Sequence, residues 1–175
     1  KELYENDLYN RVDNPIAAYA YSAEGGTVGT AAAFVVNGTV TANDATFRNF
    51  FSTKDSNAGD AAIFKVNANA VLDTNGALID HNATYGANTV AHLATNAKWY
   101  IQGETMISNN FGGRNGGMCR NDSGQIYMSG GTVKDNRAEK GGGILLINYS
   151  HMDYIDGIIS GNAVSNNGGG LFVAN

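Results

Sequence analysis

Two aspartates near the C-terminus are the closest pair of carboxylates that could take part in acid–base chemistry. Asp153 and Asp156 lie in a segment whose composition predicts a turn between short strands. Glycoside hydrolysis needs two or three carboxylates that converge on one face of the protein. A pair spaced across a turn is more typical of a solvated loop. We therefore expect no catalytic residues here and no enzymatic activity.

The other residues that could hold a metal or act as a nucleophile are few. His81, His92 and His151 occupy different positions of the repeat described below, so the sequence gives no reason to expect a zinc site. Cys119 is the single cysteine and cannot form an internal disulfide. A lone cysteine is usually a small buried apolar residue rather than a nucleophile. We expect neither a metal nor a cofactor.

Three basic residues, by contrast, recur at a regular spacing. Lys65, His92 and Arg120 are 27 and 28 residues apart. If the chain forms stacked coils of that length, the three side chains would line up on successive coils as a basic strip. Such a strip could bind acidic sugars. The alternative interpretation is an ordinary solvated face of the protein.

The charge of the chain argues against some partners. The 175 residues carry a formal net charge of -5, and charged residues make up 15% of them. This mild acidity gives no reason to expect nucleic acid or an anionic membrane as a partner. No apolar run approaches the length of a membrane span.

The chain has an internal repeat of 26 to 29 residues. Its clearest marker is three glycines followed by an aliphatic residue, at Gly141–Ile144 and Gly168–Leu171. The same spacing continued upstream places one strand position at Phe34, Ile63, Val90, Met118, Ile144 and Leu171. The residues that follow these are also apolar. Because side chains alternate between the two faces of a strand, one of the two columns should face outward and offer an apolar contact for a neighbouring chain.

A second marker is an aliphatic residue three positions before an asparagine. It occurs at Ile79 with Asn82, Ile107 with Asn110, Val133 with Asn136 and Ile159 with Asn162. Phe47 and Phe50 form a degenerate first copy. A third, apolar column lies seven residues earlier and contains Val40, Leu72, Tyr100, Ile126 and Met152. Inward asparagines at one corner of stacked coils would hydrogen-bond from coil to coil as a structural ladder.

Each repeat thus contains three short strand-like pieces separated by glycine, asparagine, aspartate or serine. No repeat contains a stretch with helical periodicity, and a propeller blade needs about 40 residues. The pattern predicts an all-β fold, a right-handed parallel β-helix with three short strands per coil. Residues 31–175 form its coils. Residues 1–30 do not follow the repeat and are expected to form an N-terminal cap and a degenerate first coil.

These glycine and asparagine motifs resemble the pectate-lyase-like β-helix repeats of bacterial and archaeal surface adhesins. They are also similar to the repeats of polymorphic outer-membrane proteins, although aliphatic residues here replace the usual phenylalanine and a third glycine replaces alanine. The resemblance covers about residues 31–175. It implies the fold strongly and function weakly, because the same coil is found in lyases, hydrolases, adhesins and filaments.

Four sequons for N-linked glycosylation begin at Asn37, Asn82, Asn121 and Asn148. Asn82 belongs to the predicted inward ladder, which argues against a glycan there. Asn37, Asn121 and Asn148 follow the first strand of their coils, where an outward loop is expected. We therefore predict these three as possible glycosylation sites.

Two hypotheses about function follow. The leading one is a non-enzymatic structural or adhesive β-helix that is extracellular or exposed on a cell surface. The alternative is a carbohydrate-active β-helix that binds acidic glycans. Gly170, Leu171, Phe172 and Val173 would form the last strand of an open coil. An open edge of this kind invites either further coils of a longer chain or another copy stacked head to tail.

Overall fold

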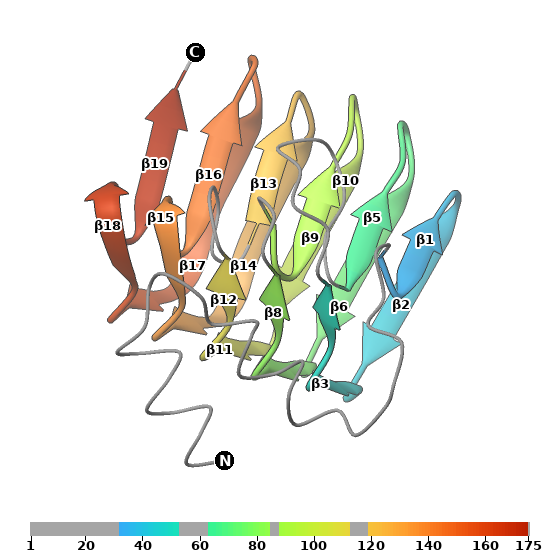
Figure 1. The fold of residues 1–175 in the computed structure, drawn as a ribbon. Coiled ribbons are helices and arrows are strands. Elements are labelled where there is room, and N and C mark those ends of the chain that lie inside the picture. The colour runs from blue at the N-terminus through green and yellow to red at the C-terminus, as the bar shows by residue number, and fades with distance from the viewer. Residues whose placement is uncertain (1–31, 53–62, 85–87, 113–118, 175) are drawn as a thin grey trace.

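The computed structural model describes residues 32–52, 63–84, 88–112 and 119–174, and these residues form a parallel β-solenoid with no helix among them (Figure 1). The predicted cap at residues 1–30 lies outside the described residues. Each turn of the solenoid takes about 27 residues. The coils contribute strands to three sheets, which we call sheets 1, 2 and 3 in the order in which the chain visits them, and the first three described coils give two short strands each to sheet 2.

Sheet 1 has six strands: β1 (Phe34–Val36), β5 (Phe64–Val66), β9 (Ala91–Leu93), β13 (Cys119–Asp122), β16 (Ile144–Ile147) and β19 (Leu171–Ala174). Sheet 2 contains β2 (Thr39–Asn43), β3 (Thr46–Arg48), β6 (Val71–Asn75), β7 (Leu78–Asp80), β10 (Lys98–Gln102), β11 (Met106–Ser108), β14 (Gln125–Lys134) and β17 (His151–Ser160). Sheet 3 contains β4 (Phe51–Ser52), β8 (Ala83–Thr84), β12 (Phe111–Gly112), β15 (Arg137–Lys140) and β18 (Ala163–Asn167).

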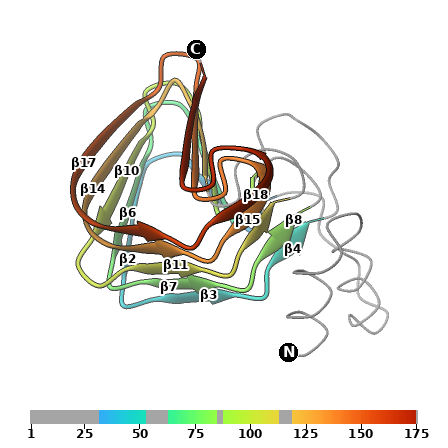
Figure 2. The same ribbon diagram turned by 90° about the vertical axis from the view of Figure 1, so that its left-hand side faces the viewer.

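All strand pairs are parallel, and each joins a strand to its equivalent one coil away. In Figure 2, which looks along the stack from its C-terminal end, the chain runs from β17 along the left and bottom to β18 and then to β19. Because this counter-clockwise path advances toward the viewer, the solenoid is right-handed. The predicted fold class is therefore confirmed.

The core consists of inward columns in which similar residues stack from coil to coil. In sheet 2, Leu72, Trp99 and Ile126 align and are fully buried. The Trp99 Nε1–H donates to Thr74 Oγ1 at 3.1 Å, which satisfies the one polar atom of this large side chain. Ile79, Ile107 and Val133 form a second column of the same sheet. Stacking at the strand spacing lets each apolar side chain fill the space above the one before it.

The prediction that Tyr100 belongs to the column of Leu72 and Ile126 was wrong by one residue. The turn between β10 and β11 contains three residues, whereas the turn between β6 and β7 contains two. The same count back from the asparagine therefore stops one residue short in this coil, and Trp99 takes the inward place. Tyr100 faces outward, where its ring stacks on that of Tyr127 with centroids 4.8 Å apart.

A similar one-residue slip affects the glycine-marked strand. Register pairs Phe34 with Phe64, Ala91, Cys119, Ile144 and Leu171, so Ile63 and Val90 occupy the place that Gly143 holds in its coil. The outward column consequently contains Val35, Lys65, His92, Arg120, Leu145 and Phe172. The prediction of an apolar outward strip is wrong, because basic residues occupy three of the six positions in this column.

The glycines of the repeat allow neighbouring coils to approach closely at one corner. The Gly143 N–H donates to the carbonyl oxygens of Gly169 and Gly170 at 3.1 Å each. A Cβ atom added to Gly143 would lie 2.5 Å from the Gly170 carbonyl oxygen, closer than real contacts allow. This position therefore requires glycine for reasons of space.

We predict that Gly143→Ala lowers the free energy of unfolding by about 1–3 kcal/mol, because the added methyl group forces the two backbones apart. Urea denaturation followed by circular dichroism measures this change. Gly38→Ala is a matched control, since a Cβ at Gly38 meets no atom within 4 Å. Equal losses of stability in the two variants would show that close packing of the coils is not the reason for the glycine.

Candidate functional site

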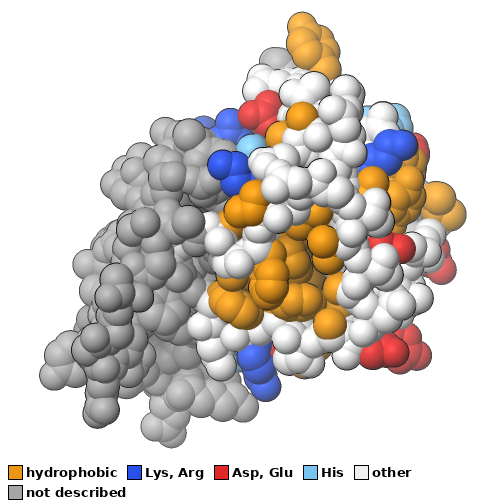
Figure 3. Space-filling model, turned by 90° about the vertical axis from the view of Figure 1, so that its right-hand side faces the viewer, with side chains coloured by type: hydrophobic (Ala, Val, Ile, Leu, Met, Phe, Trp, Pro, Cys, Tyr) orange, Lys and Arg blue, Asp and Glu red, His pale blue; other side chains and the backbone are white. Residues whose placement is uncertain are grey.

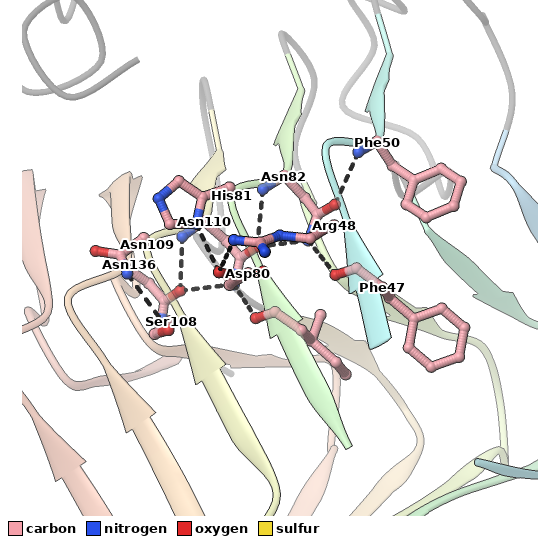
Figure 4. A network of polar contacts seen from close by, with 11 residues as sticks. Phe47, Arg48, Phe50, Asp80, His81, Asn82, Ser108, Asn109, Asn110 and Asn136 are labelled. Carbon is pink, nitrogen blue, oxygen red and sulfur yellow. Dashed lines mark hydrogen bonds and ion pairs between the residues drawn. The ribbon is translucent and has the colours of Figure 1, made fainter. Parts of the chain in front are cut away.

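The asparagine ladder runs along the corner between sheets 2 and 3 and contains Asn82, Asn110, Asn136 and Asn162, the first three of which are labelled in Figure 4. The residue before each ladder position has a left-handed backbone: Asn49, His81, Asn109, Asp135 and Gly161, with φ between 54° and 61°. Asparagine, aspartate and histidine are enriched among the non-glycine residues that adopt this conformation. The sharp bend they form turns the next side chain inward.

Asn136 illustrates the bonding of the ladder. Its Oδ1 accepts from the backbone N–H of Asn110 at 3.0 Å and from Asn110 Nδ2 at 2.9 Å. Its Nδ2 donates to Asn162 Oδ1 and to the Ile107 carbonyl oxygen, each at 3.0 Å. The side chain thus binds the coil before it and the coil after it. Asn110 and Asn136 are 1% and 0% exposed, so these bonds satisfy groups that water cannot reach.

In the first described coil, an aromatic residue replaces the asparagine of the ladder. Phe50 takes the ladder position, and its N–H donates to Asn82 Oδ1 at 2.9 Å. Its ring packs against Phe34 with centroids 6.0 Å apart, and Phe34 contacts Phe47 and Phe64 in the same cluster. At this end of the ladder an apolar cluster thus takes the place of a side-chain amide.

A charged cluster beside the ladder was not predicted. Asp80 Oδ2 accepts from Arg48 Nη2 at 2.9 Å and lies 2.7 Å from His81 Nδ1 (Figure 4). The Asp80 side chain is 9% exposed, and its Oδ1 is buried and has no hydrogen-bond partner among the described residues. Arg48 and Asp80 each precede a ladder position by two residues, so the repeat did contain the signal. The pair joins the first described coil to the second.

The predicted basic strip aligns in register but does not form an open surface. Lys65 pairs with His92, and His92 pairs with Arg120, on adjacent strands of sheet 1. His92 is only 7% exposed. The Arg120 side chain is 16% exposed and lies 3.5 Å from Asp122 Oδ2. Two of the three basic side chains are therefore largely withdrawn from the surface that a sugar polymer would touch.

The three predicted glycosylation sites differ in accessibility. Asn37 and Asn148 are exposed at the turns that follow β1 and β16. Asn121 is fully buried, and its Nδ2 donates to the carbonyl oxygens of Gly124 and His151. The prediction for Asn121 is wrong for the folded chain, because the register turns this side chain toward the core rather than outward.

The acidic pair of the last described coil is engaged locally. Asp153 Oδ1 lies 2.8 Å from His151 Nε2, and Asp156 Oδ1 accepts from the Gly157 N–H at 2.8 Å. His81, His92 and His151 lie in three different parts of the coil. Within the described ranges, no group of three His, Cys, Asp or Glu residues is arranged to hold a metal ion.

An outward face on sheet 2 was also missed by the sequence analysis. Tyr100 and Tyr127 stack between Asp73 and Asp153 in one column of adjacent strands. Gln102 Nε2 donates to Asp73 Oδ1 at 2.8 Å, which again joins two neighbouring coils. These contacts run along the axis of the solenoid, as the ladder bonds do.

Comparisons with protein-family models, with curated proteins and with solved structures give no match for this chain. The resemblance to surface adhesins therefore rests on the repeat motifs alone, and the parallel solenoid is what the structure itself adds. Among the residues that the structure describes, no helix has the length and apolarity needed to cross a bilayer.

The bonding of Asn136 predicts a clear cost for its removal. Asn136→Ala leaves the Asn110 N–H and the Ile107 carbonyl oxygen unpaired in the interior, and we expect the free energy of unfolding to fall by about 1–3 kcal/mol. Asn43→Ala, at an exposed strand position, is the control and should change it by less than about 0.5 kcal/mol. An unchanged urea midpoint for Asn136→Ala would refute a stabilising role of the ladder.

Cys119 gives a second prediction. The side chain is fully buried in sheet 1, and burial raises the pKa of its thiol well above the ordinary value. Because the thiolate is the reactive form, the native chain should resist alkylation by iodoacetamide at pH 8. Unfolding in urea should restore the reaction, as followed by mass spectrometry. Rapid alkylation of the folded chain would contradict the burial of this residue.

Proposed function

We propose that this chain is a non-enzymatic structural or adhesive β-solenoid, located outside the cell or on its surface. The observation that carries the proposal is the direction in which its polar side chains are used. The ladder, the Arg48–Asp80 ion pair and the Gln102–Asp73 bond all connect one coil to the next. Polar side chains that bind neighbouring coils to each other, rather than facing a ligand, are typical of a scaffold.

The exposed turns of sheet 1 support the same proposal. Asn67 Nδ2 donates to Asn37 Oδ1 at 2.6 Å, and Asn148 Nδ2 donates to Asp122 Oδ1 at 2.7 Å. Polar contacts between coils thus continue on the outer surface. Asn37 and Asn148 remain the positions that we propose for glycans, because both are exposed.

A second candidate function is the binding of acidic glycans by the basic strip. The register of Lys65, His92 and Arg120 on adjacent strands favours it, while the burial of His92 weighs against it. Binding of a polyuronate by the purified chain that is lost in Lys65→Ala with Arg120→Ala would support this candidate. Val35→Ala, in the same outward column and 55% exposed, is a suitable control.

The leading proposal is tested by location and by activity together. Antibodies raised against the chain should label intact cells of the source organism without permeabilisation. The purified chain should release no product from pectin, alginate or neutral glycans in a reducing-end assay. Labelling that requires permeabilisation would contradict the location, and turnover of any of these polymers would contradict the non-enzymatic assignment.

A further inference from the structure

The C-terminal edge of the described solenoid presents core residues without a coil above them. We use the name terminal coil for β17, β18 and β19, which lie at one end of the stack (Figure 1). Leu171 and Val173 occupy the inward column of sheet 1 and are 43% and 56% exposed. The equivalent residues one coil earlier, Ile144 and Leu146, are 0% and 6% exposed.

Asn162, the last residue of the ladder, determines which polar group this edge can bind. Asn162 Oδ1 accepts from the backbone N–H and the Nδ2 of Asn136, and Asn162 Nδ2 donates to the Val133 carbonyl oxygen at 3.0 Å. In Asn82, Asn110 and Asn136, the backbone N–H and a second Nδ2 hydrogen both donate to the Oδ1 of the next asparagine. For Asn162, no acceptor of these two donors lies among the described residues. Both donors therefore face the place that one further amide oxygen would occupy.

The opposite edge has different chemistry. In the first described coil the ladder position belongs to Phe50, which has no side-chain oxygen. Figure 3 looks onto this end and shows hydrophobic side chains gathered at its centre. Phe34 and Val40 there are 42% and 38% exposed, and Phe47 and Phe50 are partly buried. A second copy that docked through this end would set an aromatic ring against the two donors of Asn162.

We infer that the C-terminal edge is an interaction surface for a partner coil of the same repeat type that carries asparagine at the ladder position. An aliphatic residue three positions before that asparagine covers Ile159, and the asparagine oxygen accepts from the backbone N–H and Nδ2 of Asn162. Apolar residues of the partner's glycine-marked strand cover Leu171 and Val173. The first described coil of a second copy does not match this edge, because the side chain of Phe50 supplies no acceptor.

Two extended chains test the inference. The first is the full chain followed directly by a copy of its own residues 149–174, which continues the register because Asn175 is the repeat equivalent of Asn148. The second is identical except for Asn162→Phe in the appended copy alone, which reproduces the ladder residue of the first coil. Hydrogen exchange of individual backbone amides is measured in both and in the unextended chain.

The first extension should slow exchange of the original Asn162 amide at least about tenfold, as expected for a newly formed buried hydrogen bond. The second should not slow it, either because the appended coil docks without this bond or because it fails to dock; exchange at Leu171 and Val173 separates these two supporting outcomes. The inference is overturned if the first extension leaves Asn162 exchange unchanged, or if both extensions slow it equally. Head-to-tail oligomers of the unextended chain in sedimentation, abolished by the first extension, would also overturn it.

Discussion

Hydrogen bonds between residues about one coil apart hold this molecule together. In a parallel solenoid, strands pair with strands of the neighbouring coils, so side chains lie directly over their equivalents wherever the register is unbroken. This constraint turns the repeat into columns: aliphatic residues stack inward, glycines meet where backbones touch, and asparagine amides bridge adjacent coils. The ladder depends on this register more strictly than the apolar columns do. A shift of one residue would break its hydrogen bonds and leave its amides unpaired in the core.

The sequence predicted the features that recur with constant spacing and failed where spacing changes. The interval between Ile107 and Asn110 is the same in every ladder coil, because it lies within one corner of fixed geometry. The interval between sheet 2 strands varies by a residue, and this is why Trp99 rather than Tyr100 enters the core. The burial of Asn121 depended on register that only the paired strands reveal, whereas the Arg48–Asp80 pair could have been found from its constant distance to the ladder position.

The same constraint explains why function is hard to derive from this fold. Residues one coil apart are neighbours whatever their chemistry, so alignment of Lys65, His92 and Arg120 does not by itself create a binding surface. Accessibility decides between a site and a structural contact, and it separates the exposed Asn37 and Asn148 from the buried Asn121. The polar groups described here mostly bind each other, and the proposed scaffold role rests on this.

The position of Trp99 has a consequence for how this protein can be observed. The chain contains one tryptophan, and its indole is fully buried in a middle coil and bonded to Thr74. Solenoid coils contact only their immediate neighbours, so the outer coils can separate from the stack before the middle one opens. Tryptophan fluorescence would therefore register only the loss of the central coils, and fraying at either end would go unseen unless backbone probes were used beside it.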